Sequence, residues 1–187
     1  MISKIILSIL LIFTLTKLNA QWQNAGPIGT GNCILSVNNK IFVGTNDGLF
    51  VTDNNGNTWS VIPGNMVGEI VKCLYLASNS SIFAGTQSGI YISTDNGINW
   101  SSVYLTTSPF ISCIAGDGAN IFAGGDNTGV IHSSNYGINW TPTSSSVTGI
   151  NIKSLTISGN KVFAGTAGNG ICVTQDNGAT WATSNNG

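Results

Sequence analysis

The sequence predicts an all-β protein built from repeats, and three observations lead to this prediction. Five tryptophans recur at steps of 37, 41, 40 and 41 residues, at Trp22, Trp59, Trp100, Trp140 and Trp181. The same succession of apolar runs and glycines stands before each of the last four. Beyond the first 20 residues, no segment has the apolar period of a helix.

The first element along the chain is a predicted signal peptide over residues 1–20. Lys4 precedes an apolar run over 5–16, and Leu18-Asn19-Ala20 forms a plausible cleavage site. The run is too short to span a bilayer. We therefore expect a secreted or cell-surface protein, cleaved near Ala20, with no membrane span; an uncleaved N-terminal anchor is the alternative.

Residues 21–187 are long enough for one domain with a core of its own. Only 7% of the chain is charged, against about 25% in typical globular domains. Without Lys4 and Lys17, four lysines face seven acids, and the chain has no arginine. The sequence has no basic stripe, so nucleic acid is not an expected partner.

Each repeat divides into short apolar runs bounded by Gly, Asn, Asp and Ser, the punctuation of strands and turns. In the second repeat the runs predict strands over residues 71–76, 81–85, 90–93 and 100–104. Four short strands in about 40 residues are typical of a propeller blade. The predicted fold is a β-propeller of four-stranded antiparallel blades, with repeats ending at Trp59, Trp100, Trp140 and Trp181.

The end of each repeat resembles the Asp-box, or BNR repeat, whose pattern is Ser/Thr-x-Asp-x-Gly-x-Thr-Trp. Repeats one and three carry Asn54 and Asn135 where the pattern has aspartate. The predicted structural box residues are Thr52, Asn54, Gly56, Trp59, Ser93, Asp95, Gly97, Trp100, Ser133, Asn135, Gly137, Trp140, Thr174, Asp176, Gly178 and Trp181.

The box chemistry predicts a structural staple. The Asp or Asn side chain can accept backbone N–H groups across a tight turn, Ser or Thr can support it, and Gly supplies a positive φ. The Trp is then expected to begin the outer strand and pack under the hairpin. The motif occurs in sialidases, xyloglucanases, sortilin-type receptors, photosystem II assembly factors and many secreted bacterial proteins, so the resemblance implies a fold rather than one activity.

The repeat count predicts an incomplete ring. Trp22 resembles the outer strand of a preceding blade, and four complete repeats follow it. We expect part of a larger propeller or a truncated gene product. An open arc would expose blade faces and strand edges, so self-association through these edges is possible.

The four cysteines, Cys33, Cys73, Cys113 and Cys172, are predicted to be buried free thiols. The first three recur at intervals of 40 residues, so they occupy equivalent places on different blades and do not face one another. No CxxC or Cys/His pairing points to a metal. Cys172 aligns with Phe50, Tyr91 and Ile131, which indicates a core-filling role.

Enzyme sites are poorly supported by the residue types present. A sialidase clamps a carboxylate with arginines, which this chain lacks, and lysine does not replace their bidentate geometry. A glycosidase needs two carboxylates about 5–10 Å apart. Glu69 is the one glutamate, and Asp47, Asp117 and Asp126 are most simply solvated turn residues, although two of them could meet on one face.

A histidine in a strand and a motif in a turn are two further candidate sites. His132 occupies a strand position that is apolar in the other repeats, which favours a packed or edge histidine over a catalytic base. Asp53, Asn55 and Asn57 alternate like the start of a Ca²⁺ loop, but no closing acidic ligand follows.

Aromatic residues could also bind carbohydrate by stacking, but the five tryptophans are explained by the structural repeat. Tyr136 replaces the Asn found at positions 55, 96 and 177, and is expected on an exposed turn tip.

Together these features predict a secreted, non-catalytic module that binds a protein or a glycan through repeat faces and turn tips. No catalytic, cofactor-binding or metal-binding residue is assigned. The alternatives are a non-sialidase glycoside hydrolase, or a fragment of one, that acts on polysaccharide, and an assembly-factor-like binder of a membrane protein complex.

Overall fold

The computed structural model describes Gly26, residues 29–105 and residues 110–184. These residues form four antiparallel sheets of four strands each, hydrogen-bonded in chain order. The all-β prediction is confirmed: the helical elements of the described residues are two short 3-10 turns, Gly64–Met66 and Ser145–Val147. No helix in this part of the chain is long and apolar enough to cross a membrane. The predicted signal peptide and Trp22 lie outside the described residues.

Each sheet is one repeat, and we call it a blade. Blade 1 contains β1 (Gly31–Val37), β2 (Lys40–Thr45), β3 (Leu49–Thr52) and β4 (Ser60–Val61). Blade 2 contains β5 (Val71–Leu76), β6 (Ile82–Thr86), β7 (Gly89–Ser93) and β8 (Ser101–Leu105). Blade 3 contains β9 (Ile111–Asp117), β10 (Asn120–Gly125), β11 (Gly129–Ser133) and β12 (Thr141–Pro142). Blade 4 contains β13 (Ile152–Ser158), β14 (Lys161–Thr166), β15 (Ile171–Thr174) and β16 (Ala182–Thr183).

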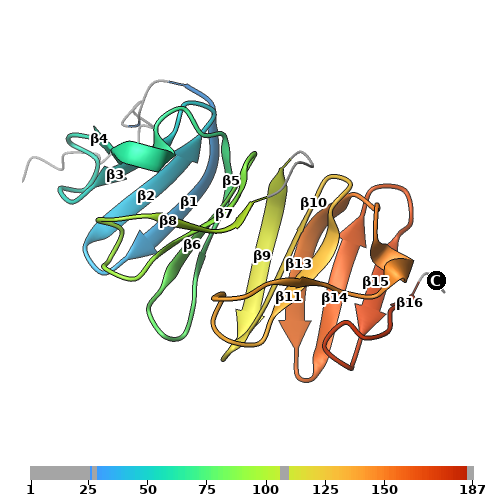
Figure 1. Cartoon of the computed structure of the whole chain (residues 1–187). Coiled ribbons are helices and arrows are strands. Elements are labelled where there is room, and N and C mark those ends of the chain that lie inside the picture. The colour runs from blue at the N-terminus through green and yellow to red at the C-terminus, as the bar shows by residue number, and fades with distance from the viewer. Residues whose placement is uncertain (1–25, 27–28, 106–109, 185–187) are drawn as a thin grey trace, which may run out of the picture.

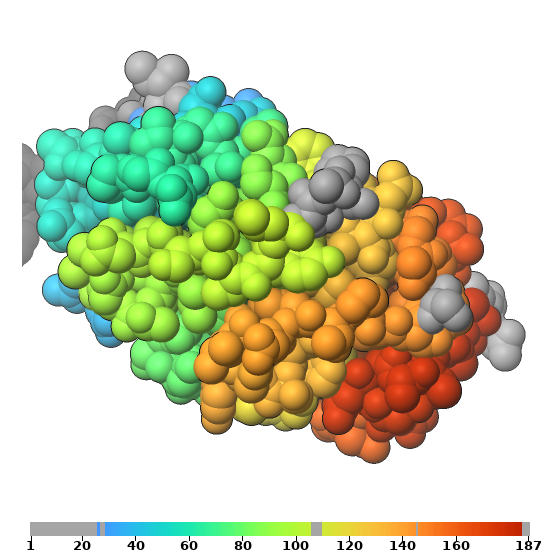
Figure 2. Space-filling model, in the orientation of Figure 1, coloured from blue at the N-terminus to red at the C-terminus, as the bar shows by residue number. Residues whose placement is uncertain are grey.

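The blades pack face to face in chain order, as in a propeller. The first strands of successive blades contact one another, β1 with β5, β5 with β9, and β9 with β13. Figure 1 shows blade 1 and blade 4 at opposite ends of the row, and Figure 2 shows the same row filled by side chains. The described residues therefore form an open arc of four blades.

The strands of blade 2 lie within one residue of the predicted bounds, with one difference at the tryptophan. Trp100 does not begin the outer strand, which starts at Ser101. Its indole Nε1 donates to the Gly97 carbonyl at 3.2 Å, so the residue belongs to the turn rather than to the ladder.

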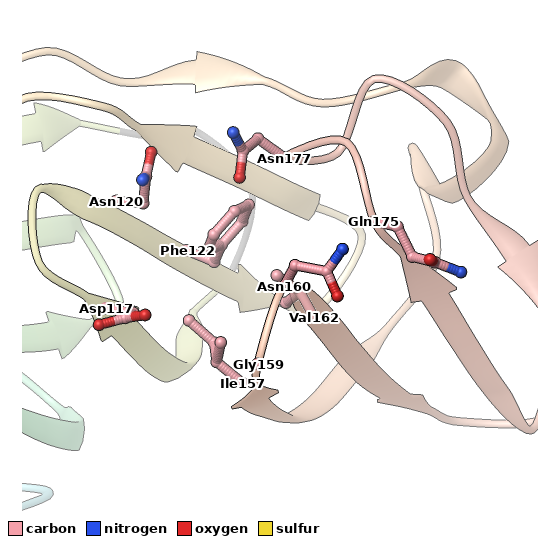
Figure 3. A pocket seen from close by; sticks show the side chains of 9 residues that line it. All are labelled: Asp117, Asn120, Phe122, Ile157, Gly159, Asn160, Val162, Gln175 and Asn177. Carbon is pink, nitrogen blue, oxygen red and sulfur yellow. The ribbon is translucent and has the colours of Figure 1, made fainter.

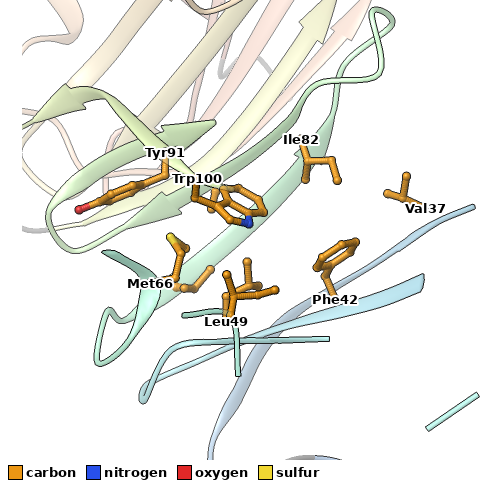
Figure 4. Packing of buried hydrophobic residues seen from close by; sticks show 10 residues of the cluster. Val37, Phe42, Leu49, Met66, Ile82, Tyr91 and Trp100 are labelled. Atoms are coloured by element: carbon orange, nitrogen blue, oxygen red, sulfur yellow. The ribbon is translucent and has the colours of Figure 1, made fainter. Parts of the chain in front are cut away.

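The core lies between blades rather than within one of them, because successive residues of a strand point to opposite faces and both faces are covered. Between blades 1 and 2, Phe42 and Leu49 meet Ile82, Tyr91 and Trp100 (Figure 4). Equivalent clusters fill the other two interfaces. One close approach depends on glycine: a Cβ on Gly97 would collide with the Phe42 ring.

Three cysteines take equivalent places on the inner strands, beside a glycine of the neighbouring strand. Cys33 pairs with Gly44 and Cys73 with Gly85 in the β-ladders. A Cβ added to either glycine would collide with the facing sulfur. All four cysteines are free; Cys172 is buried, whereas Cys33 and its two equivalents are only partly buried.

Candidate functional site

The Asp-box of blade 2 ties the turn between β7 and β8 with side-chain hydrogen bonds. The Ser93 hydroxyl donates to Asp95 Oδ1 at 2.8 Å and accepts the Gly97 N–H at 2.9 Å. Asp95 Oδ1 also accepts the Asn99 N–H at 2.9 Å, and Asp95 Oδ2 accepts the Asn99 side-chain amide at 2.7 Å. The carboxylate thus satisfies donors that the turn leaves without a strand partner.

The boxes with asparagine form the same turn with fewer charge-assisted bonds. In blade 1, Asn54 Oδ1 accepts the Thr52 hydroxyl at 2.8 Å and the Thr58 N–H at 3.0 Å. In blade 3, Asn135 Oδ1 accepts the Ser133 hydroxyl and the Asn139 N–H, both at 2.9 Å. In blade 3 the amide oxygen alone accepts across the turn, whereas in blade 1 Asn54 Nδ2 also donates to Thr58 Oγ1 at 2.7 Å.

The two aspartate boxes hold their carboxylates charged. Hydrogen bonds from Asn99 and Ser93 lower the pKa of Asp95 to about 2. Hydrogen bonds from the Thr174 and Thr180 hydroxyls and the Thr180 N–H lower the pKa of Asp176 to about 2. Both side chains favour the anion, which suits a structural acceptor and not a general acid near neutral pH.

The box tips share a left-handed turn residue followed by the box glycine. Asn55, Asn96, Tyr136 and Asn177 have φ between 56° and 60°. Tyr136 is 39% exposed, so the one aromatic at this turn position is at the surface. Asp53, Asn55 and Asn57 lie at the blade 1 turn, and the described residues contain no cluster of three His, Cys, Asp or Glu that could hold a metal ion.

The three remaining aspartates do not gather at one place. In each antiparallel blade, the turns after the first and third strands lie at one rim, and the turn after the second strand lies at the other. Asp117 ends β9 at the rim that carries the boxes. Asp47 and Asp126 follow β2 and β10 at the opposite rim, on blades that are not neighbours. Asp126 forms an ion pair with Lys153.

A cleft of about 380 Å³ opens at the box rim between blades 3 and 4. Figure 3 shows Phe122 among the side chains that line it. Its polar lining consists of amides and one carboxylate, and the lining residues are Asp117, Asn120, Phe122, Ile157, Gly159, Asn160, Val162, Gln175 and Asn177. The volume falls in the range of ligand pockets, about 300–1,000 Å³.

The corresponding place between blades 1 and 2 also holds a cleft of about 380 Å³, beside Asn38, Leu76 and Asn96, but a lysine crosses between the blades there. There Lys40 Nζ donates to the Asn96 carbonyl at 3.1 Å. Asn120 occupies the position of Lys40, before the Ile-Phe pair of its strand, but its Oδ1 lies 3.0 Å from His132 Nε2 of the same blade. A shorter side chain that bonds within its own sheet therefore does not make the bond that Lys40 makes to the neighbouring box.

The box of blade 4 is also seated differently. Gly97 and Gly137 each pack on a phenylalanine of the preceding blade, whereas Gly178 packs on Thr143. Trp181 Nε1 donates to Thr143 Oγ1 at 3.2 Å, where Trp100 and Trp140 donate to their own box glycine. This change accompanies the cleft beside Phe122.

His132 is packed into blade 3. Its ring stacks on Phe122 with centroids 4.4 Å apart, and burial lowers its pKa. The cysteines are equally unsuited to catalysis, because burial raises the pKa of Cys33 to about 11 and that of Cys113 to about 12. Neither thiol supplies the thiolate that a nucleophile needs at neutral pH.

Sequence reasoning did not identify the amide lining of the cleft. Asn120, Asn160, Gln175 and Asn177 are ordinary turn residues in a chain rich in asparagine. One signal was present: Asn120 stands where repeats one and four have Lys40 and Lys161. Whether the side chain at that position bonds to the next blade depends on a contact between blades, and the sequence of a single repeat does not show that contact.

The comparisons with known proteins agree with this architecture. The BNR/Asp-box repeat family matches residues 91–102, which contain the box of blade 2. No curated protein matches the sequence.

Solved structures match over most of the chain. The computationally designed Ika4 protein is 14% identical with a TM-score of 0.64, over 80% of this chain and 92% of the designed one. A GH74 enzyme from Niastella koreensis is 24% identical with a TM-score of 0.61, over 82% of this chain and 24% of the enzyme. YCF48 from Cyanidioschyzon merolae is 17% identical with a TM-score of 0.61, over 84% of this chain and 57% of that protein.

The chain thus spans about a quarter of the length of the GH74 enzyme and over half of YCF48. At these identities the likeness establishes the fold. The repeat match and the blade geometry agree: the chain contains a BNR/Asp-box repeat and has the fold of a β-propeller segment.

Proposed function

We propose that this chain is an exported, non-catalytic β-propeller module that binds a polar ligand in the cleft between blades 3 and 4. A glycan is the first candidate ligand, and a protein segment is the second. The observation that carries the proposal is the lining of that cleft by amide side chains and one carboxylate around a buried phenylalanine.

The chemistry of the cleft suits a ligand rich in hydroxyl groups. Each amide offers a carbonyl acceptor and an NH₂ donor, and a carboxylate accepts from hydroxyls. Asn160, Gln175 and Asn177 come from two turns of blade 4, and Asn120 and Asp117 come from one hairpin of blade 3. A sugar that bridges the two blades could bond to both sets.

A glycoside hydrolase is the second candidate, favoured by the structural likeness to GH74 enzymes. Two-carboxylate hydrolysis needs a pair of acids about 5–10 Å apart. Of the described residues that line the cleft, Asp117 is the one acid. Binding is therefore better supported than hydrolysis. The likeness to YCF48 motivates the third candidate, an assembly-factor-like binder.

The test is a panel of polysaccharides and oligosaccharides on the purified protein, scored for binding and for product release together. The decisive variant is Asn160→Ala with Gln175→Ala, which removes two amides from the cleft. Gln87→Ala, an exposed amide on a loop of blade 2, is the matched control. We expect binding without release, a loss of roughly tenfold or more in the double variant, and none in the control.

Other outcomes would discriminate between the candidates. Product release that disappears in Asp117→Asn would establish a hydrolase and overturn the non-catalytic proposal. Binding that is unchanged in the double variant would place the ligand elsewhere. No glycan binding would leave a protein ligand as the better hypothesis.

Export has its own test. N-terminal sequencing of the protein recovered from the medium or periplasm of expressing cells is expected to begin at or near Gln21. Recovery of the chain only in the membrane fraction, with its first 20 residues retained, would support the N-terminal anchor.

A further inference from the structure

Each interface between blades joins two unlike faces. The first is a receiving face, formed by one residue of each of the three inner strands. In blades 2, 3 and 4 the ladders place these residues side by side as Leu74, Ala84 and Tyr91, as Ile114, Ala123 and Ile131, and as Leu155, Ala164 and Cys172. All nine lie in the clusters packed against the preceding blade.

The second is an inserting face, centred on the phenylalanine of the second strand. Phe42, Phe83 and Phe122 are at most 1% exposed, because the next blade covers each of them. Phe42 and Phe83 pack directly on the box glycines Gly97 and Gly137 of that next blade.

Blade 1 repeats the receiving face, and the residues that the structure describes place no blade against it. Its residues are Ile34, Val43 and Phe50, in the same cross-strand register. Ile34 is 71% exposed and Val61, beside Phe50, is 43% exposed. Gly56, the box glycine that corresponds to Gly97, is partly exposed rather than buried. Exposed apolar residues gathered on one sheet face are typical of an interaction surface.

Blade 4 repeats the inserting face, and this face is also partly exposed. Phe163, the equivalent of Phe83, is partly exposed, and Val173 lies beside it in the ladder. Lys161 occupies the position of Lys40, which bonds to the Asn96 carbonyl across the first interface. Lys161 is exposed, and Asn55 of blade 1 corresponds to Asn96. The apolar and polar elements of an internal interface are therefore divided between the two ends of the arc.

We propose that two copies of this chain associate head to tail, with blade 4 of each copy inserted against blade 1 of the other. Phe163 then packs on the receiving face around Ile34, Phe50 and Gly56, and Lys161 reaches the Asn55 carbonyl. Because the two faces are unlike, the contact is heterologous and forms a ring only if the copies close on each other. The described blades of two copies number eight, at the upper end of the usual range of about 4–8, whereas those of three copies number twelve.

The first experiment measures mass by light scattering during gel filtration at concentrations of about 1–100 μM, a range that detects dissociation constants in the micromolar range or below. We expect twice the chain mass for the wild type. Phe163→Asp and Ile34→Asp are each expected to give a monomer, with an unchanged circular dichroism spectrum. Ile138→Asp alters an equally exposed isoleucine on the box turn of blade 3 and is expected to stay dimeric.

Mixing the two monomeric variants tests the head-to-tail geometry. The blade 4 face of Ile34→Asp and the blade 1 face of Phe163→Asp are both intact, so the mixture should recover a dimer through one interface. The recovered dimer should bind about a hundredfold or more weakly than the wild type, because one of two contacts is lost. A monomeric wild type, a dimer that survives either substitution, or no recovery on mixing would overturn the proposal.

Discussion

Blades 2 and 4 are built from the same repeat, but among the described residues blade 2 lies between two other blades and blade 4 has a blade on one face. Phe83 is fully buried and Phe163 is not, although the two residues stand in the same motif and the same strand register. Each repeat thus specifies its strands and turns by itself, whereas its burial depends on the adjacent blade. This is the nearest-neighbour behaviour expected of repeat proteins.

The largest difference is expected when each phenylalanine is truncated. Phe83→Ala should lower the free energy of unfolding by about 3–5 kcal/mol, since it leaves a cavity between blades 2 and 3. Phe163→Ala should lower it by about 1 kcal/mol at most, because the ring is already partly in water. Urea unfolding at a concentration that keeps the chain monomeric measures both. Equal losses would show that blade 4 is covered in the isolated chain.

Glycine substitution separates backbone strain from contact between blades. Gly97 and Gly159 both have positive φ, 80° and 59°, so alanine at either should cost about 1 kcal/mol. At Gly97 the new Cβ would also meet the Phe42 ring, whereas at Gly159 nothing lies within 4 Å. Thermal unfolding should therefore show a total loss in the free energy of unfolding of about 2–4 kcal/mol for Gly97→Ala. For Gly159→Ala the loss should stay at about 1 kcal/mol. Similar melting temperatures for the two variants would contradict this packing.

Acid should weaken blades 2 and 4 while sparing the boxes of blades 1 and 3. The pKa values of Asp95 and Asp176 are lowered to about 2, so their contribution to stability is full above pH about 4. It is lost as the pH falls through about 2, where the folded-state carboxylates take up protons. The urea midpoint of the wild type should fall between pH 4 and pH 2.

Two variants check that acid prediction. Asp95→Asn with Asp176→Asn should flatten the pH dependence toward that of an asparagine box. Asn54→Asp should steepen it, by adding a titrating carboxylate to blade 1. A pH dependence identical in all three proteins would assign acid sensitivity to other groups.

The smallest effect is expected at the inner strands. Lys72 Nζ lies 3.5 Å from Asn32 and Asn46 of blade 1, and Lys153 pairs with Asp126 of blade 3 at the equivalent place. Lys153→Ala should cost about 1 kcal/mol or less, because the pair is exposed. The loss should shrink further in 1 M salt. Urea unfolding at two salt concentrations measures it, and a loss that salt leaves unchanged would indicate lost packing instead.

Much of the fold was predictable because the same pattern of strands and turns occurs four times in the sequence. Turn glycines, alternating apolar runs and the tryptophan spacing place the strands of blade 2 within one residue. The predicted start of the outer strand at Trp100 was wrong by one residue, because the Trp100 indole bonds to the Gly97 carbonyl and the residue belongs to the turn. Such a side-chain bond leaves no trace in the apolar pattern.

The cleft was not predictable in the same way. Its lining differs from that of the cleft between blades 1 and 2, because Asn120 bonds to His132 within blade 3 and Gly178 packs on Thr143 across the interface. In the sequence, His132 stood out only as a polar residue at a strand position that is apolar in the other three repeats. Departures from a repeat therefore deserve as much weight as the repeat when a site is sought.

The cysteines of the inner strands can report local opening of the blades, because their reaction with a thiol reagent depends on how accessible the sulfur is. Cys33 and Cys73 fit because the glycines beside them lack a Cβ, and both thiols are partly buried while the ladder is closed. Burial raises the pKa of both thiols, so a thiol reagent should react slowly with the closed blade and faster when an inner strand separates from its neighbour. The rates of labelling at these two positions should therefore give the opening frequencies of blade 1 and blade 2 separately, without any engineered probe.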